Sequence, residues 1–123
     1  MQTKFRVVSL SHKSAPVHIR ELISLDEAAI QRLLLKLKEF FSVSDALILS
    51  TCNRTEVYYS HELDLSVELV KLIGMERGLA NAISYLDYFE VLNDSISLYQ
   101  TKLCLLLLPV STLACIDRVV PWS

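Results

Sequence analysis

A short polar segment, residues 51–56 (TCNRTE), carries the residue types best suited to chemistry. A cysteine becomes a nucleophile when a nearby cation or backbone N–H groups stabilise its thiolate. Arg54 could supply that cation, and its planar guanidinium also suits bidentate recognition of a carboxylate. Cys52 and Arg54 together therefore predict acyl chemistry on an acidic substrate. Thr51 and Asn53 add hydrogen-bonding groups at the same point.

The same segment also admits a plain structural interpretation. A single cysteine beside a strand is commonly a buried small hydrophobe. Arg54 could simply pair with Glu56 or Glu21. No general base is fixed either, because each imidazole suits a surface or capping position; the three are His12, His18 and His61.

Four apolar or alternating segments that could position these residues have the pattern of strands. They cover residues 5–10, 46–49, 55–62 and 88–92. The polar segment falls between the second and third of them. An Asn93-Asp94 turn follows the fourth.

Helical segments separate these strands. Ser14 could cap a short helix that continues to Leu22, with Pro16 in its first turn. Residues 24–27 (SLDE) have the form of a capping box. The helix that they open carries a core-facing stripe: Ile30, Leu33, Leu34, Leu37 and Phe41.

A further amphipathic helix is expected over residues 65–73, with Val67, Val70 and Ile73 apolar and with Gly74 and Gly78 marking its end. The resulting order is β-α-β-β-α-β. This split pattern predicts an α/β (α+β) fold with a small, mostly antiparallel sheet covered on one face by helices.

Composition excludes several kinds of function. The chain has 123 residues, enough for one domain, and a net charge of -2. A pI near 5.9 gives no global attraction to nucleic acid. Only two glycines occur, so the sequence has neither a dinucleotide fingerprint nor a P-loop. The three cysteines show no zinc-binding spacing, and no metal site is expected.

The sequence also indicates a cytoplasmic protein. Charges at Lys4, Arg6 and Lys13 interrupt the N-terminus, which therefore does not resemble a signal peptide. The longest uncharged stretch, residues 103–116, is shorter than the roughly 20 residues that span a bilayer. Three free thiols, Cys52, Cys104 and Cys115, suit a reducing compartment.

The character of the chain changes near residue 94. Among 12 basic and 14 acidic residues, only Lys102, Asp117 and Arg118 lie after Asp94. Residues 103–108 are almost all leucine, with no clear helical or strand period. We therefore expect a domain over residues 1–94 and an atypical apolar tail over residues 95–123.

Two segments resemble glutamyl-tRNA reductase. Residues 50–58 (STCNRTEVY), after apolar residues 47–49, are similar to its active-site motif. Residues 10–17 (LSHKSAPV), followed by Arg20 and Glu21, are similar to its N-terminal signature. Both occur in the family's order and spacing, and the resemblance covers roughly residues 4–94.

The resemblance implies NADPH-dependent reduction of glutamyl-tRNA to glutamate-1-semialdehyde, the first step of tetrapyrrole synthesis through 5-aminolevulinate. Cys52 would be the catalytic nucleophile that forms a thioester. Arg54 would hold the side-chain carboxylate of the substrate, in a pocket lined by Thr51, Cys52 and Asn53. The family would also imply a homodimer and transfer of the product to glutamate-1-semialdehyde aminotransferase, with no membrane contact.

This sequence also departs from the family. Full-length members add an NADPH-binding domain, a connecting helix and a dimerisation domain, and a histidine expected shortly after residue 94 is missing. We expect the chain to leave the family's reading frame there, or to end in an unrelated exon, and so to be incomplete for reduction. Two alternatives remain: a remnant that only hydrolyses its substrate or serves as an interaction module, and an unrelated α/β domain with a structural Cys52.

Overall fold

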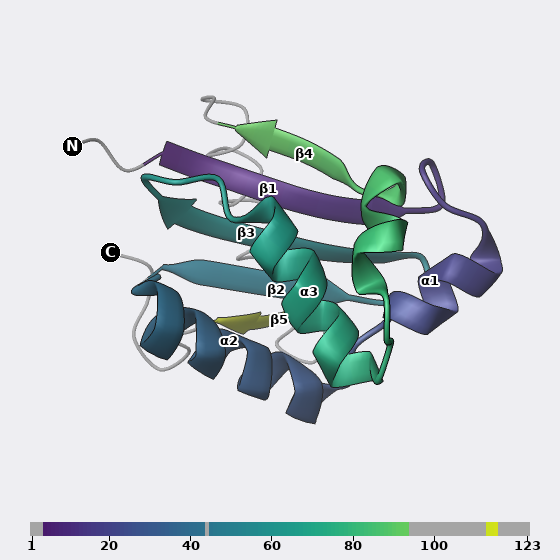
Figure 1. Cartoon of the computed structure of the whole chain (residues 1–123), viewed down its shortest axis with the longest axis horizontal. Coiled ribbons are helices and arrows are strands. Elements are labelled where there is room, and N and C mark those ends of the chain that lie inside the picture. Colours follow the sequence, from purple (N-terminus) through teal and green to yellow (C-terminus); the bar gives the residue numbers. More distant parts are fainter. Residues whose placement is uncertain (1–3, 44, 94–112, 116–123) are drawn as a thin grey trace.

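A computed structural model describes residues 4–43, 45–93 and 113–115. Within them the chain forms one antiparallel sheet of five strands in the order β4-β1-β3-β2-β5 (Figure 1). The elements are β1 (Lys4–Ser11), α1 (Val17–Ile23), α2 (Glu27–Phe41), β2 (Ala46–Ser50), β3 (Arg54–His61), α3 (Ser66–Arg77), the 3-10 helix η1 (Ala82–Tyr88), β4 (Glu90–Asn93) and β5 (Leu113–Cys115).

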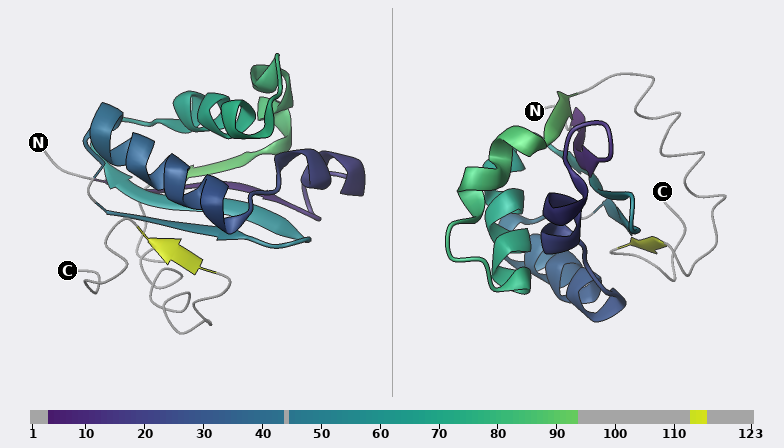
Figure 2. Two further views of the ribbon diagram at one scale, coloured as in Figure 1. Left: turned by 90° about the horizontal axis from the view of Figure 1, so that it is seen from below. Right: turned by 90° about the vertical axis from the view of Figure 1, so that its right-hand side faces the viewer.

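The expected split β-α-β-β-α-β fold is confirmed. α2, α3 and η1 lie together on one side of the sheet, and α1 lies at its end (Figure 2). β3 occupies the centre, between β1 and β2, and β4 pairs with the other edge of β1. β1 connects to the parallel strand β2 through α1 and α2, and β3 connects to the parallel strand β4 through α3 and η1, as this topology requires.

Strand alternation divides the sheet into two faces. The helix-covered face of β1 and β3 carries Val8, Leu10, Val57 and Tyr59, which join the main core with the helices. The opposite face carries a smaller buried cluster of Val7, Leu47, Leu49 and Tyr58. Polar side chains on this same face, described below, form the candidate site.

The stripe expected on α2 is confirmed, since Ile30, Leu33, Leu34 and Leu37 are buried and Phe41 packs against the core. The expected capping box is wrong, because the N-cap of α2 lies two residues after Ser24. Asp26 is the N-cap of α2, and its carboxylate accepts a hydrogen bond from the N–H of Ala29 at 2.8 Å. Ser24 instead ends α1, where its N–H donates to the carbonyl of Arg20.

The expected cap at Ser14 is also wrong. Pro16 is the N-cap of α1 and makes no side-chain cap bond. Ser14 belongs to the preceding turn, in which its Oγ donates to the carbonyl of Ser11 at 3.3 Å and accepts from the N–H of Ser11 at 3.1 Å. The serine hydroxyl thus closes the turn that follows β1.

The third helix is longer than expected, and Gly74 does not end it. Gly74 lies inside α3, where an added Cβ would come within 2.1 Å of the Ala82 Cβ, so the glycine allows η1 to pack against α3. Gly78 does end α3, in the left-handed conformation at φ 68°. Val67, one of the three apolar residues named for this helix, is 37% exposed.

Two polar clusters hold neighbouring elements together. Glu76 of α3, with 4% of its side chain exposed, accepts hydrogen bonds from Arg32 at 2.8 Å and Lys36 at 3.1 Å, both on α2. Arg6, buried in β1, donates to the carbonyls of His61 and Glu62 and to the side chain of Asn93. The first cluster joins two helices, and the second holds β4 beside β1.

Two elements were absent from the sequence expectations. η1 fills the segment between α3 and β4, and the expected strand over residues 88–92 is shifted to β4. β5 pairs antiparallel with β2 at the sheet edge opposite β4. The remaining positions of the apolar tail, and the Asp94 half of the expected turn, lie outside the described residues.

Candidate functional site

Cys52 occupies the tip of the hairpin that joins β2 and β3. The N–H of Thr51 donates to the carbonyl of Arg54 at 2.8 Å, which closes the turn around Cys52 and Asn53. Inside the turn, the N–H of Asn53 donates to the Thr51 hydroxyl at 3.2 Å. The Cys52 side chain is exposed and its thiol is free. The interpretation of Cys52 as a buried small hydrophobe is therefore wrong.

The two sequence segments singled out above meet at this turn. The His12 N–H donates to the carbonyl of Asn53 at 3.1 Å. In the same register, Ser11 at the end of β1 lies opposite Arg54 at the start of β3. The sheet thus brings the turn after β1 against the Cys52 turn, although about 40 residues separate them in the chain.

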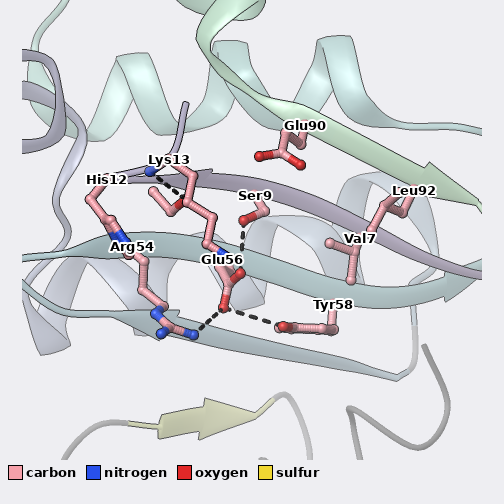
Figure 3. Close-up of a pocket in the computed structure, with 10 residues that line it drawn as sticks. Val7, Ser9, His12, Lys13, Arg54, Glu56, Tyr58, Glu90 and Leu92 are labelled. Carbon is pink, nitrogen blue, oxygen red and sulfur yellow. Dashed lines mark hydrogen bonds and ion pairs between the residues drawn. The ribbon is translucent and has the colours of Figure 1, made fainter. Parts of the chain in front are cut away.

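A cavity of about 230 Å³ lies beside these turns, on the sheet face opposite α2 and α3 (Figure 3). Polar groups surround most of it, and apolar side chains form one end. The lining residues are Val7, Ser9, Ser11, His12, Lys13, Arg54, Glu56, Tyr58, Glu90 and Leu92. This volume is below the roughly 300–1,000 Å³ of pockets for drug-sized ligands. It therefore suits a group of amino-acid size.

Of the four expected site residues, Arg54 alone lines this cavity. Its side chain is 45% exposed, and one guanidinium nitrogen lies 3.5 Å from a carboxylate oxygen of Glu56. The expected alternative pairing of Arg54 with Glu56 is thus found. At that distance and exposure the pair is weak, and most of the guanidinium donors remain available for a ligand.

Glu56 is a polar centre of the site that the sequence expectations did not single out. With 12% of its side chain exposed, its carboxylate accepts hydrogen bonds from Ser9 at 2.7 Å and Tyr58 at 3.2 Å. Figure 3 shows it between β1 and the Arg54 guanidinium. A buried carboxylate with three donors is well compensated.

The environment of Glu56 also affects Tyr58. Burial raises the pKa of the Tyr58 phenol well above its ordinary value, and the charge of Glu56 and the hydrogen bond to it raise the pKa further. The positive charge of Arg54 acts in the opposite direction. Tyr58 therefore remains a neutral donor to Glu56 throughout the physiological pH range.

The three histidines lie in different places. His12 lines the cavity, whereas His18 is exposed on α1. His61 lies at the far end of β3, where its ring bridges the carbonyl of Phe41 and the N–H of Leu63, both at 3.0 Å. His61 thus serves as a cap, and His12 alone of the three adjoins the site.

Glu56 could have been found by period-two alternation, which places it on the same face as Arg54 and Tyr58. Ser9 and Glu90 could not, because their proximity depends on the strand order.

Among the described residues, no group of three or more His, Cys, Asp or Glu side chains could hold a metal ion. No helix in the described ranges has the length and apolar character needed to cross a membrane.

Comparison with known proteins places these features in a family. The sequence model for the N-terminal domain of glutamyl-tRNA(Glu) reductase matches residues 8–102. A glutamyl-tRNA reductase from Cytophaga hutchinsonii is 42% identical over 94 residues, which cover 76% of this chain and 22% of that protein. One from Heliobacterium mobile is 41% identical over 86 residues, 69% of this chain and 19% of that protein.

Among solved structures, glutamyl-tRNA reductase from Methanopyrus kandleri is similar, with a TM-score of 0.46 and 33% identity. The similarity covers 56% of this chain and 16% of that one. The chain thus matches about a fifth of the length of the curated relatives named above.

Proposed function

Because the chain belongs to the glutamyl-tRNA reductase N-terminal domain family, we propose that Cys52 accepts the glutamyl group of glutamyl-tRNA as a thioester. The observation that carries this proposal is the exposed, free thiol at the β2–β3 tip, two residues before Arg54, which closes the turn and lines an amino-acid-sized cavity. An acyl carrier as large as tRNA can approach a thiol only at such an exposed position.

The proposed step is an acyl transfer. The Cys52 thiolate attacks the ester carbonyl carbon, and a carbon–sulfur bond forms. The carbon–oxygen bond to the terminal ribose breaks, and the ribose oxygen leaves with a proton from solvent or a nearby acid. A thioester is more reactive toward nucleophiles than the oxygen ester, so one difficult step becomes two easier ones.

Arg54 is the proposed carboxylate-binding residue. The substrate's α-carboxyl is consumed in the ester, so its side-chain carboxylate is the free acidic group. The Arg54 guanidinium is half-exposed and only weakly paired, and its planar fork matches a carboxylate. Thr51 and Asn53, which shape the Cys52 turn, are proposed to border the glutamyl group on the thiol side.

NADPH is the reductant that the family resemblance implies, but the described residues do not fit it. Phosphate cradles of dinucleotide sites use glycine-rich turns at the end of a strand. Gly74 packs inside α3 and Gly78 ends it, so neither glycine serves such a turn. The step derived for this chain therefore ends at the thioester.

Reduction to glutamate-1-semialdehyde, and hence the contribution to tetrapyrrole synthesis, is proposed for the whole protein of which this domain is typical. Dimerisation and product transfer to an aminotransferase belong to the same proposal.

The exposure of Cys52 favours a second activity for the chain on its own, since water can reach the thioester. In that case the net reaction would be hydrolysis of glutamyl-tRNA.

Trapping the thioester tests the proposal. The full chain is mixed with glutamyl-tRNA carrying labelled glutamate, quenched in acid, and separated from tRNA. We expect protein-bound label that hydroxylamine releases, and none in Cys52→Ser. A variant with Cys104→Ser and Cys115→Ser keeps Cys52 and should still be labelled. Equal labelling of Cys52→Ser would contradict the proposal, and absence of label from every variant would favour a non-catalytic interaction module.

A further inference from the structure

A row of three polar residues crosses the sheet in the cavity. Ser9 of β1 lies directly opposite Glu56 of β3 and directly opposite Glu90 of β4. All three residues line the cavity, and Figure 3 shows both carboxylates flanking Ser9. The two glutamates are separated by two strand spacings, or about 10 Å between backbones.

The two carboxylates in this row are not equivalent. Glu56 is largely buried and accepts hydrogen bonds from Ser9, Tyr58 and Arg54. Glu90 is exposed, and no hydrogen bond or ion pair from another described residue reaches its carboxylate. Glu56 is therefore a structural acceptor whose donors are already in place, whereas Glu90 is an acceptor available to a ligand.

Within the cavity, Glu56 lies between the cationic side and Glu90 (Figure 3). The cationic side chains, Lys13 and Arg54, come from the turn after β1 and the start of β3, close to the Cys52 turn. Glu90 comes from β4, which Arg6 holds against β1. Val7 and Leu92 form an apolar end below the charged row. This arrangement suits a short aliphatic group that carries one anion and one cation.

We propose that Glu90 binds the α-ammonium group of the glutamyl substrate, while Arg54 binds its side-chain carboxylate. This inference rests on the proposed function. A glutamyl ester has these two charges, joined by a short aliphatic chain, and its ester carbonyl lies next to the ammonium-bearing carbon. Placing the ammonium at Glu90 leaves the carbonyl end free to reach toward the Cys52 turn.

The competing arrangement is an ion pair between Glu90 and Lys13 that closes the cavity to ligands. The structure has no such pair, although both side chains line the same cavity. In that case, removing the charge of Glu90 would free Lys13 and strengthen binding of any anionic ligand. The two arrangements therefore predict opposite changes in affinity.

The test uses glutamic acid α-methyl ester and its N-acetyl derivative, which differ in the ammonium charge. Their dissociation constants are measured by NMR titration of the full chain carrying Cys52→Ser, which prevents acylation. We expect the free-amine ester to bind more tightly, and Glu90→Gln to weaken its binding about fivefold with little change for the N-acetyl form. Glu39→Gln, the same charge change on the exposed face of α2, should alter neither.

Equal losses for both esters, no loss for either, or tighter binding of the N-acetyl ester in Glu90→Gln would overturn the inference. Failure of both esters to bind the Cys52→Ser chain would overturn it as well. The result is separable from the proposed function. Thioester formation with unchanged selectivity in Glu90→Gln would refute the role of Glu90 alone. If Glu90→Gln loses the preference for the free-amine ester, but the chain that keeps Cys52 forms no thioester, the acyl-transfer proposal alone is refuted.

Discussion

Replacing Glu56 with glutamine tests the polar centre of the site most sharply. The side chains have nearly the same shape, so the substitution removes a negative charge without leaving a cavity. In the wild-type chain the carboxylate accepts from Ser9 at 2.7 Å, from Tyr58 at 3.2 Å and from Arg54 at 3.5 Å. Glutamine keeps one carbonyl acceptor and turns an NH₂ group toward the remaining donors.

The magnitude follows from these contacts. A hydrogen bond to a charged group contributes about 1.5–3 kcal/mol, against about 1 kcal/mol between neutral groups. The Ser9 and Tyr58 hydroxyls can rotate to accept from the new amide, so no buried group need lose every partner. Arg54 is half-exposed, and its pair adds at most about 1 kcal/mol. We expect Glu56→Gln to lower the free energy of unfolding by about 1–2 kcal/mol.

Urea denaturation followed by circular dichroism measures this change, and thermal melting should show a loss of roughly 4–8 °C per kcal/mol. A second readout is specific to the contact. The pKa of Tyr58 is raised by burial first and then by Glu56, so ultraviolet titration of the phenols should show one tyrosine with a lower pKa in Glu56→Gln. Thioester formation should also slow, because Arg54 loses the anion that orients it.

Glu39→Gln is the matched control, since Glu39 is exposed on α2 and far from the cavity. An unchanged tyrosine titration in Glu56→Gln would refute the assigned contact between Glu56 and Tyr58. Unfolding free energies equal to those of Glu39→Gln would show that the carboxylate network contributes nothing to stability. If Glu56→Gln folds normally and is acylated at the wild-type rate, Glu56 has no role in the site.

Three further predictions concern the framework. Burial tends to raise the pKa of Glu76, but its two cationic partners on α2 outweigh this and lower it, so its stabilising effect is present at neutral pH and lost as pH falls through the carboxyl range. Acid titration of stability should therefore be shallower in Glu76→Gln, and an equally steep profile would refute this. Burial, above all, raises the pKa of Tyr59 to about 12, so the wild-type chain should lose stability between about pH 10 and pH 12. Tyr59→Phe should show a smaller alkaline loss, with the share due to Tyr58 retained, but should unfold about 1–3 kcal/mol more easily at neutral pH, because the Leu65 N–H loses its acceptor; unchanged urea midpoints would contradict this. Gly74→Ala should destabilise by about 1–3 kcal/mol despite alanine's helix propensity, because the new Cβ would meet Ala82 at 2.1 Å; greater stability in urea would show that η1 can move away.

Much of the fold could be predicted because it depends on local periodicity. Apolar and β-branched runs located β1 and β2, alternation located β3, and the stripe on α2 located its buried face. Helix ends were harder, since neighbouring residues compete for the same role. Ser24 and Asp26 are both good caps, and only the structure shows that Ser24 ends α1 and Asp26 begins α2.

Contacts between elements distant in sequence could not be predicted. Gly74 was expected at a helix end because glycine disfavours helices, but it is retained inside α3 by close packing of η1. The Cys52 turn was expected from residue types alone. Its meeting with His12 depends on the β1–β3 register, and the place of Glu90 depends on β4 pairing with β1.

Locating the acyl group on the protein tests the central proposal most directly. After reaction with labelled glutamyl-tRNA and acid quenching, the full chain is digested at low pH and its peptides are sequenced by mass spectrometry. The proposal predicts a glutamyl modification on Cys52, lost in Cys52→Ser and strongly reduced in Arg54→Lys, whose point charge cannot reproduce the guanidinium fork. A modification on another residue, or an unmodified Cys52 in a folded chain that binds glutamyl-tRNA, would contradict it.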